Sequence, residues 1–71
     1  MSSSANQDAV FLEDVVILRE TDLAVLAEID GEEKWIPKSL ILDESEVWSI
    51  KNPGPGTLVV PEWFAVKEGL A

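Results

Sequence analysis

Carboxylates are the most abundant chemically active side chains of this chain. Fourteen Asp and Glu residues stand against five Lys and Arg, and there is no His and no Cys. Thiolate nucleophiles, zinc–thiolate sites and imidazole acid–base catalysis are therefore excluded. Carboxylates or lysine could still act alone, or carboxylate pairs could bind Mg²⁺ or Ca²⁺. Because no EF-hand spacing, glycine-rich phosphate loop or nucleophile motif accompanies them, we expect a non-catalytic protein without a cofactor or metal.

Several carboxylates are spaced so that they could form rows of negative charge. Residues i and i+2 of a strand project from one face about 6.6 Å apart, and Glu44 and Glu46 have this spacing. Such a row can imitate a nucleic-acid backbone and attract a basic protein. The alternative is an acidic surface that only keeps the protein soluble. In either case the net charge of −9 opposes binding to phosphate backbones or anionic lipid.

Tryptophan and lysine residues form a second candidate surface. Lys34, Lys38 and Lys51 lie near Trp35 and Trp48 in the sequence, and together they could form a platform that stacks on single-stranded nucleic acid. The alternative is that these lysines are solvated or paired with glutamates. From both surfaces we predict five partner-binding residues: Trp35, Lys38, Glu44, Glu46 and Trp48.

Asp30 and Gly31 give the clearest structural signal. Asp-Gly is a preferred pair for a two-residue type I′ turn, so residues on either side are expected to form a hairpin. The predicted cross-strand pairs are Ile29 with Glu32, Glu28 with Glu33, Ala27 with Lys34, Leu26 with Trp35 and Val25 with Ile36. A three-residue loop would relieve the contact between two glutamates, but it would remove Gly31 from the position that requires a positive φ.

Alternation and turn residues predict the remaining elements. Strands are expected over residues 14–20, 23–29, 33–36, 46–50 and 57–60, with 9–12 as an apolar lead-in and 1–8 as a disordered tail. Residues 37–40 suggest a tight turn or a single 3₁₀ turn.

A short helix is expected at the C-terminal end, over residues 61–68. Pro61 and Gly69 bracket it in the usual order of proline at the start and glycine past the end. Trp63, Val66 and Leu70 recur at i, i+3 and i+7, so they predict an apolar stripe that docks on the sheet. This stripe places Trp63 in the core, whereas the exposure of Trp35 and Trp48 is left open by their strand positions.

Five short strands and a terminal helix favour one small antiparallel barrel domain over residues 9–71, of SH3-like or OB-like form. An open sheet with the helix across one face is the alternative. No apolar run approaches the roughly 20 residues that span a bilayer, and residues 1–9 lack the features of a signal peptide. We therefore expect a soluble cytoplasmic protein, and its oligomeric state is left open.

Three segments of the chain, WIPKSLI, SEVW and GTLVVPEWFAVKEGL, resemble a family of small bacteriophage and prophage proteins. Members carry a similar WIPKS segment after a DGEE-like hairpin, and they end with a VPEW helix and a near-terminal GL. The resemblance covers about residues 16–70 and implies a viral or prophage origin, with no activity or site residues to carry over. The strand that runs into a proline-containing turn at residues 35–40 is also similar to SH3 domains, although this chain has no Tyr.

Two functions are compatible with these observations. The first is a non-catalytic acidic protein-binding module, encoded by a phage, that acts in the host cell on a basic nucleic-acid-handling protein as a nucleic-acid mimic or inhibitor. The second is a small barrel that binds single-stranded nucleic acid through tryptophan and lysine.

Overall fold

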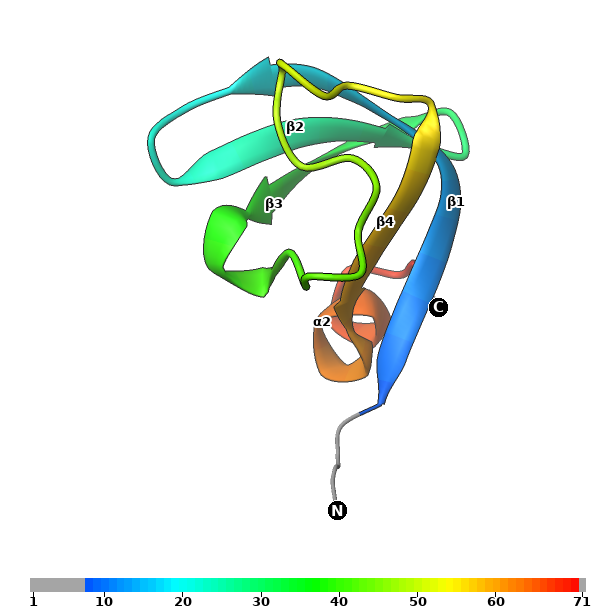
Figure 1. Cartoon of the computed structure of the whole chain (residues 1–71). Helices are drawn as coiled ribbons and strands as arrows, with labels where there is room; N and C mark the ends of the chain where they lie inside the picture. Colours follow the sequence, from blue (N-terminus) through cyan, green and yellow to red (C-terminus); the bar gives the residue numbers. More distant parts are fainter. Residues whose placement is uncertain (1–7, 71) are drawn as a thin grey trace.

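The computed structural model of the chain describes residues 8–70, so the tail predicted for residues 1–8 lies outside the described residues except for Asp8. Four strands, a 3₁₀ turn and a helix follow in order: β1 (Ala9–Glu20), β2 (Ala24–Ile29), β3 (Glu32–Pro37), η1 (Lys38–Leu40), β4 (Gly56–Pro61) and α2 (Glu62–Lys67). The strands form one antiparallel sheet in the order β3-β2-β1-β4, and α2 lies at one end of it (Figure 1). The prediction of a mainly β fold with a short C-terminal helix is confirmed.

The β2–β3 hairpin has the predicted turn and register. Asp30 and Gly31 both have positive φ, 52° and 82°, as a type I′ turn requires. All five predicted cross-strand pairs are present, including Glu28 opposite Glu33. The two glutamates are exposed, so water screens the repulsion between them. Because the observed register is that of the two-residue turn, the alternative three-residue loop is wrong.

β1 is one continuous strand that pairs with β4 over its first part and with β2 over its second part. Two irregularities of register interrupt it, between Leu12 and Val15 and between Ile17 and Arg19. At the first one Asp14 has a φ of 59°, a left-handed conformation that Asp tolerates better than most residues. This bulge lets Leu12 and Val15 both face the core although they are three positions apart. The predicted lead-in at 9–12 is thus the first third of a strand.

The strand predicted for residues 46–50 does not form. The segment between η1 and β4 contains one isolated bridge, between Ser49 and Asn52, and it runs along the outer edge of β4. There the Val59 N–H donates to the Ser45 hydroxyl at 2.8 Å, and the Thr57 N–H donates to Glu46 Oε1 at 3.1 Å. Side chains thereby occupy backbone groups that a regular ladder would use. A ladder that would close a barrel between β3 and β4 is also absent from the pairings of residues 8–70.

α2 begins and ends where the sequence indicates, but it docks through a different face. Pro61 is its N-cap and Glu68 its C-cap. Leu70 N–H donates to the Ala65 carbonyl at 2.7 Å after Gly69, which has a φ of 74°, and this is a Schellman ending. The buried residues of the helix are Phe64 and Ala65, whereas Trp63 is 60% exposed. The predicted stripe was wrong, because Trp63 and Val66 lie on the exposed face of the helix, and only Leu70, beyond the end of the helix, packs against the core.

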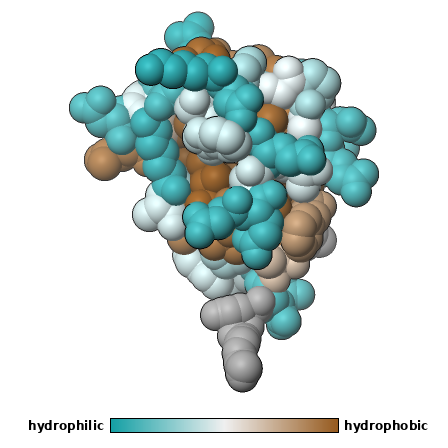
Figure 2. Space-filling view, in the orientation of Figure 1, coloured by the Kyte–Doolittle hydropathy of each residue, from teal (hydrophilic) through white to brown (hydrophobic). Residues whose placement is uncertain are grey.

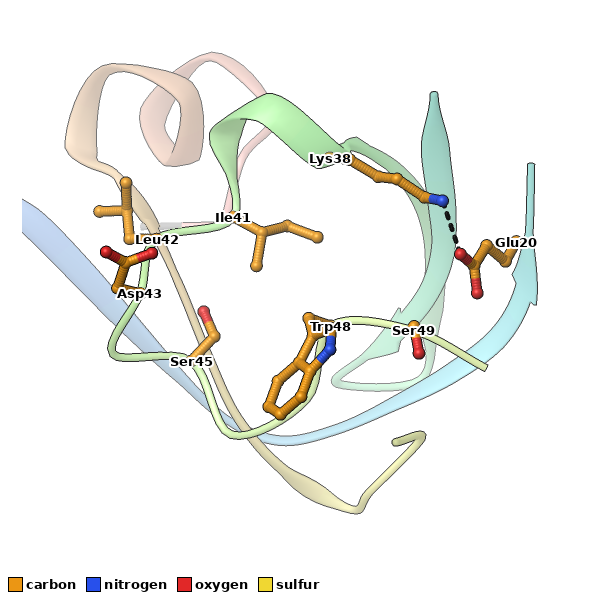
Figure 3. A pocket seen from close by; sticks show the side chains of 8 residues that line it. All are labelled: Glu20, Lys38, Ile41, Leu42, Asp43, Ser45, Trp48 and Ser49. Carbon is orange, nitrogen blue, oxygen red and sulfur yellow. Dashed lines mark hydrogen bonds and ion pairs between the residues drawn. The ribbon is translucent and has the colours of Figure 1, made fainter. Parts of the chain in front are cut away.

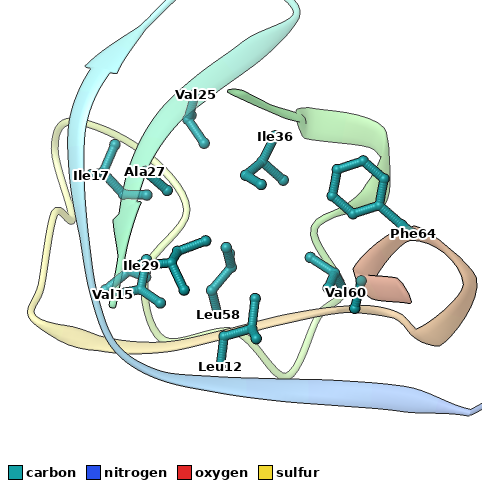
Figure 4. Close-up of a cluster of buried hydrophobic side chains, with 12 residues drawn as sticks. Leu12, Val15, Ile17, Val25, Ala27, Ile29, Ile36, Leu58, Val60 and Phe64 are labelled. Atoms are coloured by element: carbon teal, nitrogen blue, oxygen red, sulfur yellow. The ribbon is translucent and has the colours of Figure 1, made fainter. Parts of the chain in front are cut away.

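The core is almost entirely aliphatic and lies between the sheet, α2 and the segment that precedes β4. Among residues 8–70, its one buried aromatic side chain is Phe64, which points from α2 into the cluster (Figure 4). Val47 also belongs to this cluster and is 2% exposed, so the segment before β4 is anchored by its own apolar side chain. The cluster comprises Leu12, Val15, Ile17, Val25, Ala27, Ile29, Ile36, Val47, Leu58, Val60, Phe64 and Ala65.

Neighbouring aromatic residues of α2 should differ sharply in their effect on stability. Phe64 is 5% exposed, so Phe64→Ala should lower the free energy of unfolding by about 3–5 kcal/mol. Trp63 contacts Phe64 edge to face, with ring centroids 5.9 Å apart, and Trp63→Ala should cost only about 0.5–1.5 kcal/mol. Urea denaturation followed by circular dichroism measures both, and Phe64→Leu is the milder variant if Phe64→Ala does not fold. Equal losses for Trp63→Ala and Phe64→Ala would contradict this packing.

Two glycines with positive φ should also differ from each other. A Cβ at Gly54 would lie 2.5 Å from the Val15 carbonyl oxygen and 2.8 Å from Val47 Cγ1, whereas a Cβ at Gly31 would meet no atom within 4 Å. Gly31→Ala should cost about 1–2 kcal/mol through its φ alone. Gly54→Ala should cost about 1–3 kcal/mol more because of the clash. The comparison of denaturation midpoints tests this, and a Gly54→Ala midpoint equal to that of Gly31→Ala would refute it.

Candidate partner-binding pocket

A pocket of about 440 Å³ lies between the end of β1, η1 and the segment that precedes β4. Figure 3 shows the Lys38 and Glu20 side chains at one side of it, Leu42 and Asp43 at the other, and Ile41 and Trp48 between them. On the face drawn in Figure 2, a hydrophobic area lies in the middle and is bordered by hydrophilic residues. The lining residues are Glu20, Lys38, Ile41, Leu42, Asp43, Ser45, Trp48 and Ser49.

The apolar wall of the pocket is held in place by β4. The Leu42 N–H donates to the Val59 carbonyl at 2.9 Å, and the buried Ser45 hydroxyl bonds both backbone groups of the same residue. Two residues further, Val47 enters the core, and the neighbouring Trp48 is 49% exposed. A half-exposed indole on a fixed backbone is well suited to anchor a partner.

The polar side of the pocket is a clamp formed by Glu20. Its Oε2 accepts a hydrogen bond from the Lys38 ammonium, and its Oε1 accepts one from the Ile50 N–H at 2.9 Å. The pKa of the Glu20 carboxyl lies below its ordinary value of 4.5, chiefly because of the hydrogen bond from the Lys38 ammonium and to a smaller extent because of the one from the Ile50 N–H. Glu20 thus joins the end of β1 to η1 and to the segment after Trp48.

Asp43 is the other carboxylate of the pocket. It is exposed, and it has neither an ion pair nor a side-chain hydrogen bond within residues 8–70. The charged groups of the lining are the carboxylates of Glu20 and Asp43 and the ammonium of Lys38, so the lining carries one net negative charge. Glu20 and Lys38 neutralise each other. The net charge is therefore located at Asp43.

The five predicted partner-binding residues occupy different places. Lys38 and Trp48 come together in the pocket. Trp35 is 49% exposed on the outer face of β3, beside Leu26, and does not line the pocket. Glu44 is exposed next to Asp43. Glu46 is also exposed and accepts a hydrogen bond from the Thr57 N–H, and no strand forms there to place Glu44 and Glu46 on one face by alternation.

The proposed tryptophan and lysine platform is only partly assembled. Trp48 and Lys38 share the pocket, but Lys34, Lys51 and Trp35 do not line it. Lys51 is close enough to Glu20 to help lower the pKa of that carboxyl. The lysine of the pocket is therefore engaged by a glutamate, which is the alternative that the sequence left open.

Several lining residues were not among the predicted site residues. Glu20 comes to Lys38 from 18 positions away, and no local pattern in the sequence signals this contact. Ile41 and Leu42 look like core residues by composition, but both are only partly buried. Asp43 belongs to the same acidic group as Glu44, and only the fold shows that Asp43 lines the pocket whereas Glu44 does not.

Residues 8–70 contain no group of three or more acidic side chains placed to hold a metal ion. Over the same residues, no helix has the length and apolar character needed to cross a bilayer. Comparisons of the chain with protein-family models, curated proteins and solved structures gave no match.

The Glu20 clamp should make stability depend on pH. The pKa of Glu20 is lower in the folded state than in the unfolded state. The stabilisation of the folded state by the Glu20 carboxylate is therefore complete at pH values above the unfolded-state pKa, and it is lost as the pH falls through the folded-state pKa. Glu20→Gln should therefore reduce the free energy of unfolding near pH ~7, and this reduction should be smaller near pH ~3. Denaturation at both pH values measures the difference. Glu44→Gln, at an exposed residue outside the clamp, serves as the control. If Glu20→Gln lowered the free energy of unfolding equally at both pH values, the clamp would be refuted.

Proposed function

We propose that the chain is a non-catalytic, acidic protein-binding module that holds a basic segment of a partner protein in the pocket beside Trp48. The observation that carries this proposal is the distribution of charge in the pocket. Lys38 is already paired with Glu20, whereas the Asp43 carboxylate has no cation within the described residues. The pocket therefore offers a partner an apolar wall and an unpaired negative charge.

The composition of the pocket agrees with a protein partner. Aromatic residues commonly anchor interfaces, because they remove a large area from water for a small loss of side-chain freedom. Trp48 is the aromatic residue of this lining, and Ile41 and Leu42 extend the apolar area around it. The net charge of −9 adds a long-range attraction for a basic protein, which raises the association rate and weakens with salt.

Single-stranded nucleic acid is the second candidate ligand, supported by the half-exposed Trp48 beside Lys38. An indole can stack on a base, but affinity depends on neutralising phosphates. Binding would require Lys38 to leave Glu20 and would also have to overcome repulsion from Asp43. The protein partner is favoured for this reason.

The origin and scaffold of the module form part of the same proposal. The resemblance to bacteriophage and prophage proteins supports a phage-encoded protein that acts in the host cytoplasm, on a nucleic-acid-handling protein that it inhibits. We also propose an SH3-like small barrel in which residues 41–55 take the place of a fifth strand. The bonds from Leu42 and Glu46 to β4, and the burial of Val47, support this arrangement.

Charge reversal near the pocket should abolish binding of the partner. The double variant Asp43→Lys with Glu44→Lys changes two exposed residues of the segment, whereas Glu46 is left intact because it holds Thr57. Capture from host lysate, followed by mass spectrometry and titration with the purified partner, should identify a basic protein. Its association rate should fall with added salt, and the double variant should fail to bind it.

The matched control is Glu32→Lys with Glu33→Lys, which makes the same change of charge on β3, away from the pocket. This control should keep most of its binding. A parallel titration with mixed-sequence single-stranded DNA at low salt tests the second candidate. Oligonucleotide binding that Lys38→Glu abolishes, without capture of a basic protein, would replace the proposed function with the second one.

A further inference from the structure

The charge and shape of the pocket also indicate which group of the partner it takes, and this inference rests on the proposed function. We propose that the pocket binds the side chain of one arginine. Its aliphatic stem would lie on Ile41 and Leu42, and its guanidinium would stack on Trp48 and pair with Asp43. The lining residues supply each of these surfaces (Figure 3).

Charge complementarity selects a cation. Glu20 has both carboxylate oxygens in use, one with Lys38 and one with the Ile50 N–H. Asp43 is the lining carboxylate whose charge no ion pair of residues 8–70 compensates, so an anionic ligand would be repelled by it. A cation that enters the pocket pairs with Asp43 and leaves the ion pair between Glu20 and Lys38 intact.

The aromatic and aliphatic lining favours arginine over lysine. A guanidinium is planar and weakly hydrated, so it can stack on an indole while its N–H groups bond a carboxylate. A lysine ammonium is a strongly hydrated point charge and loses more when it is placed against an apolar wall. The two groups that the proposal assigns to the guanidinium, Asp43 and Trp48, both line this one pocket.

The size of the pocket is compatible with a long side chain. About 440 Å³ lies near the lower end of the range of ~300–1,000 Å³ that is usual for pockets that bury small molecules. This space accommodates an extended arginine with part of its own backbone. The Ser49 hydroxyl also lines the pocket and accepts a hydrogen bond from the Lys51 N–H at 3.0 Å.

Short peptides test the inference directly on the whole chain. Capped Gly-Arg-Gly, Gly-Lys-Gly and Gly-citrulline-Gly are titrated while NMR follows the indole N–H signals of the three tryptophans, assigned from single Trp→Phe variants. The arginine peptide should shift the Trp48 signal, leave those of Trp35 and Trp63 unchanged, and bind more tightly than the lysine peptide. Citrulline, which keeps the shape without the charge, should bind at least about tenfold more weakly.

Matched variants separate the pocket from general attraction of charge. Asp43→Asn should weaken binding of the arginine peptide by about tenfold. Glu44→Gln removes the adjacent exposed charge and should change binding little. Trp48→Leu should weaken it by roughly fivefold, whereas Trp35→Leu, at an equally exposed residue outside the pocket, should not. Equal losses for Asp43→Asn and Glu44→Gln would overturn the inference.

Two further results would also overturn it: equal affinity for the arginine and citrulline peptides, or no shift of the Trp48 signal with any peptide. Neither result alone removes the proposed function. The proposed function is refuted by different results: the captured partner is not basic, or the Asp43→Lys, Glu44→Lys variant still binds it.

Discussion

The whole fold depends on β1 keeping its apolar side chains on one face while it pairs with two different strands. Its first part bonds β4 and its second part bonds β2, so it has to bend between them. An uninterrupted strand would alternate strictly, and Val15 would then face away from Leu12. The bulge at Asp14 corrects the phase and increases the local twist. The sheet can therefore curve around one aliphatic core, which a chain of this size needs for stability.

The pocket depends on a second departure from regular structure, at the outer edge of β4. Ser45 and Glu46 use their side chains to satisfy β4 backbone groups, and Val47 fixes the same segment in the core. The segment is thus irregular but has few free backbone groups along this edge. It can present Asp43 and Trp48 at defined positions without forming a strand, which would have turned alternate side chains toward opposite faces.

The sequence predicted the elements that are determined by local chemistry. The Asp30-Gly31 turn determined the hairpin register, and Pro61 and Gly69 determined the ends of the helix, because these residues act through their own backbone conformations. The failures concern contacts between distant residues. Six residues of helix define a docking face poorly, so Phe64 could not be preferred to Trp63. The bonds of Ser45 and Glu46 to β4, and of Glu20 to Lys38, join residues more than ten positions apart, and they decided both the missing strand and the composition of the pocket.

The position of the tryptophans has a spectroscopic consequence. Trp35 and Trp48 are each 49% exposed and Trp63 is 60% exposed, while the buried aromatic side chain of the core is a phenylalanine. The intrinsic fluorescence of the folded protein therefore originates from indoles in contact with water, and its emission should lie close to that of the unfolded chain. Fluorescence is consequently a weak reporter of folding for this protein, and a sensitive reporter of whatever covers its surface.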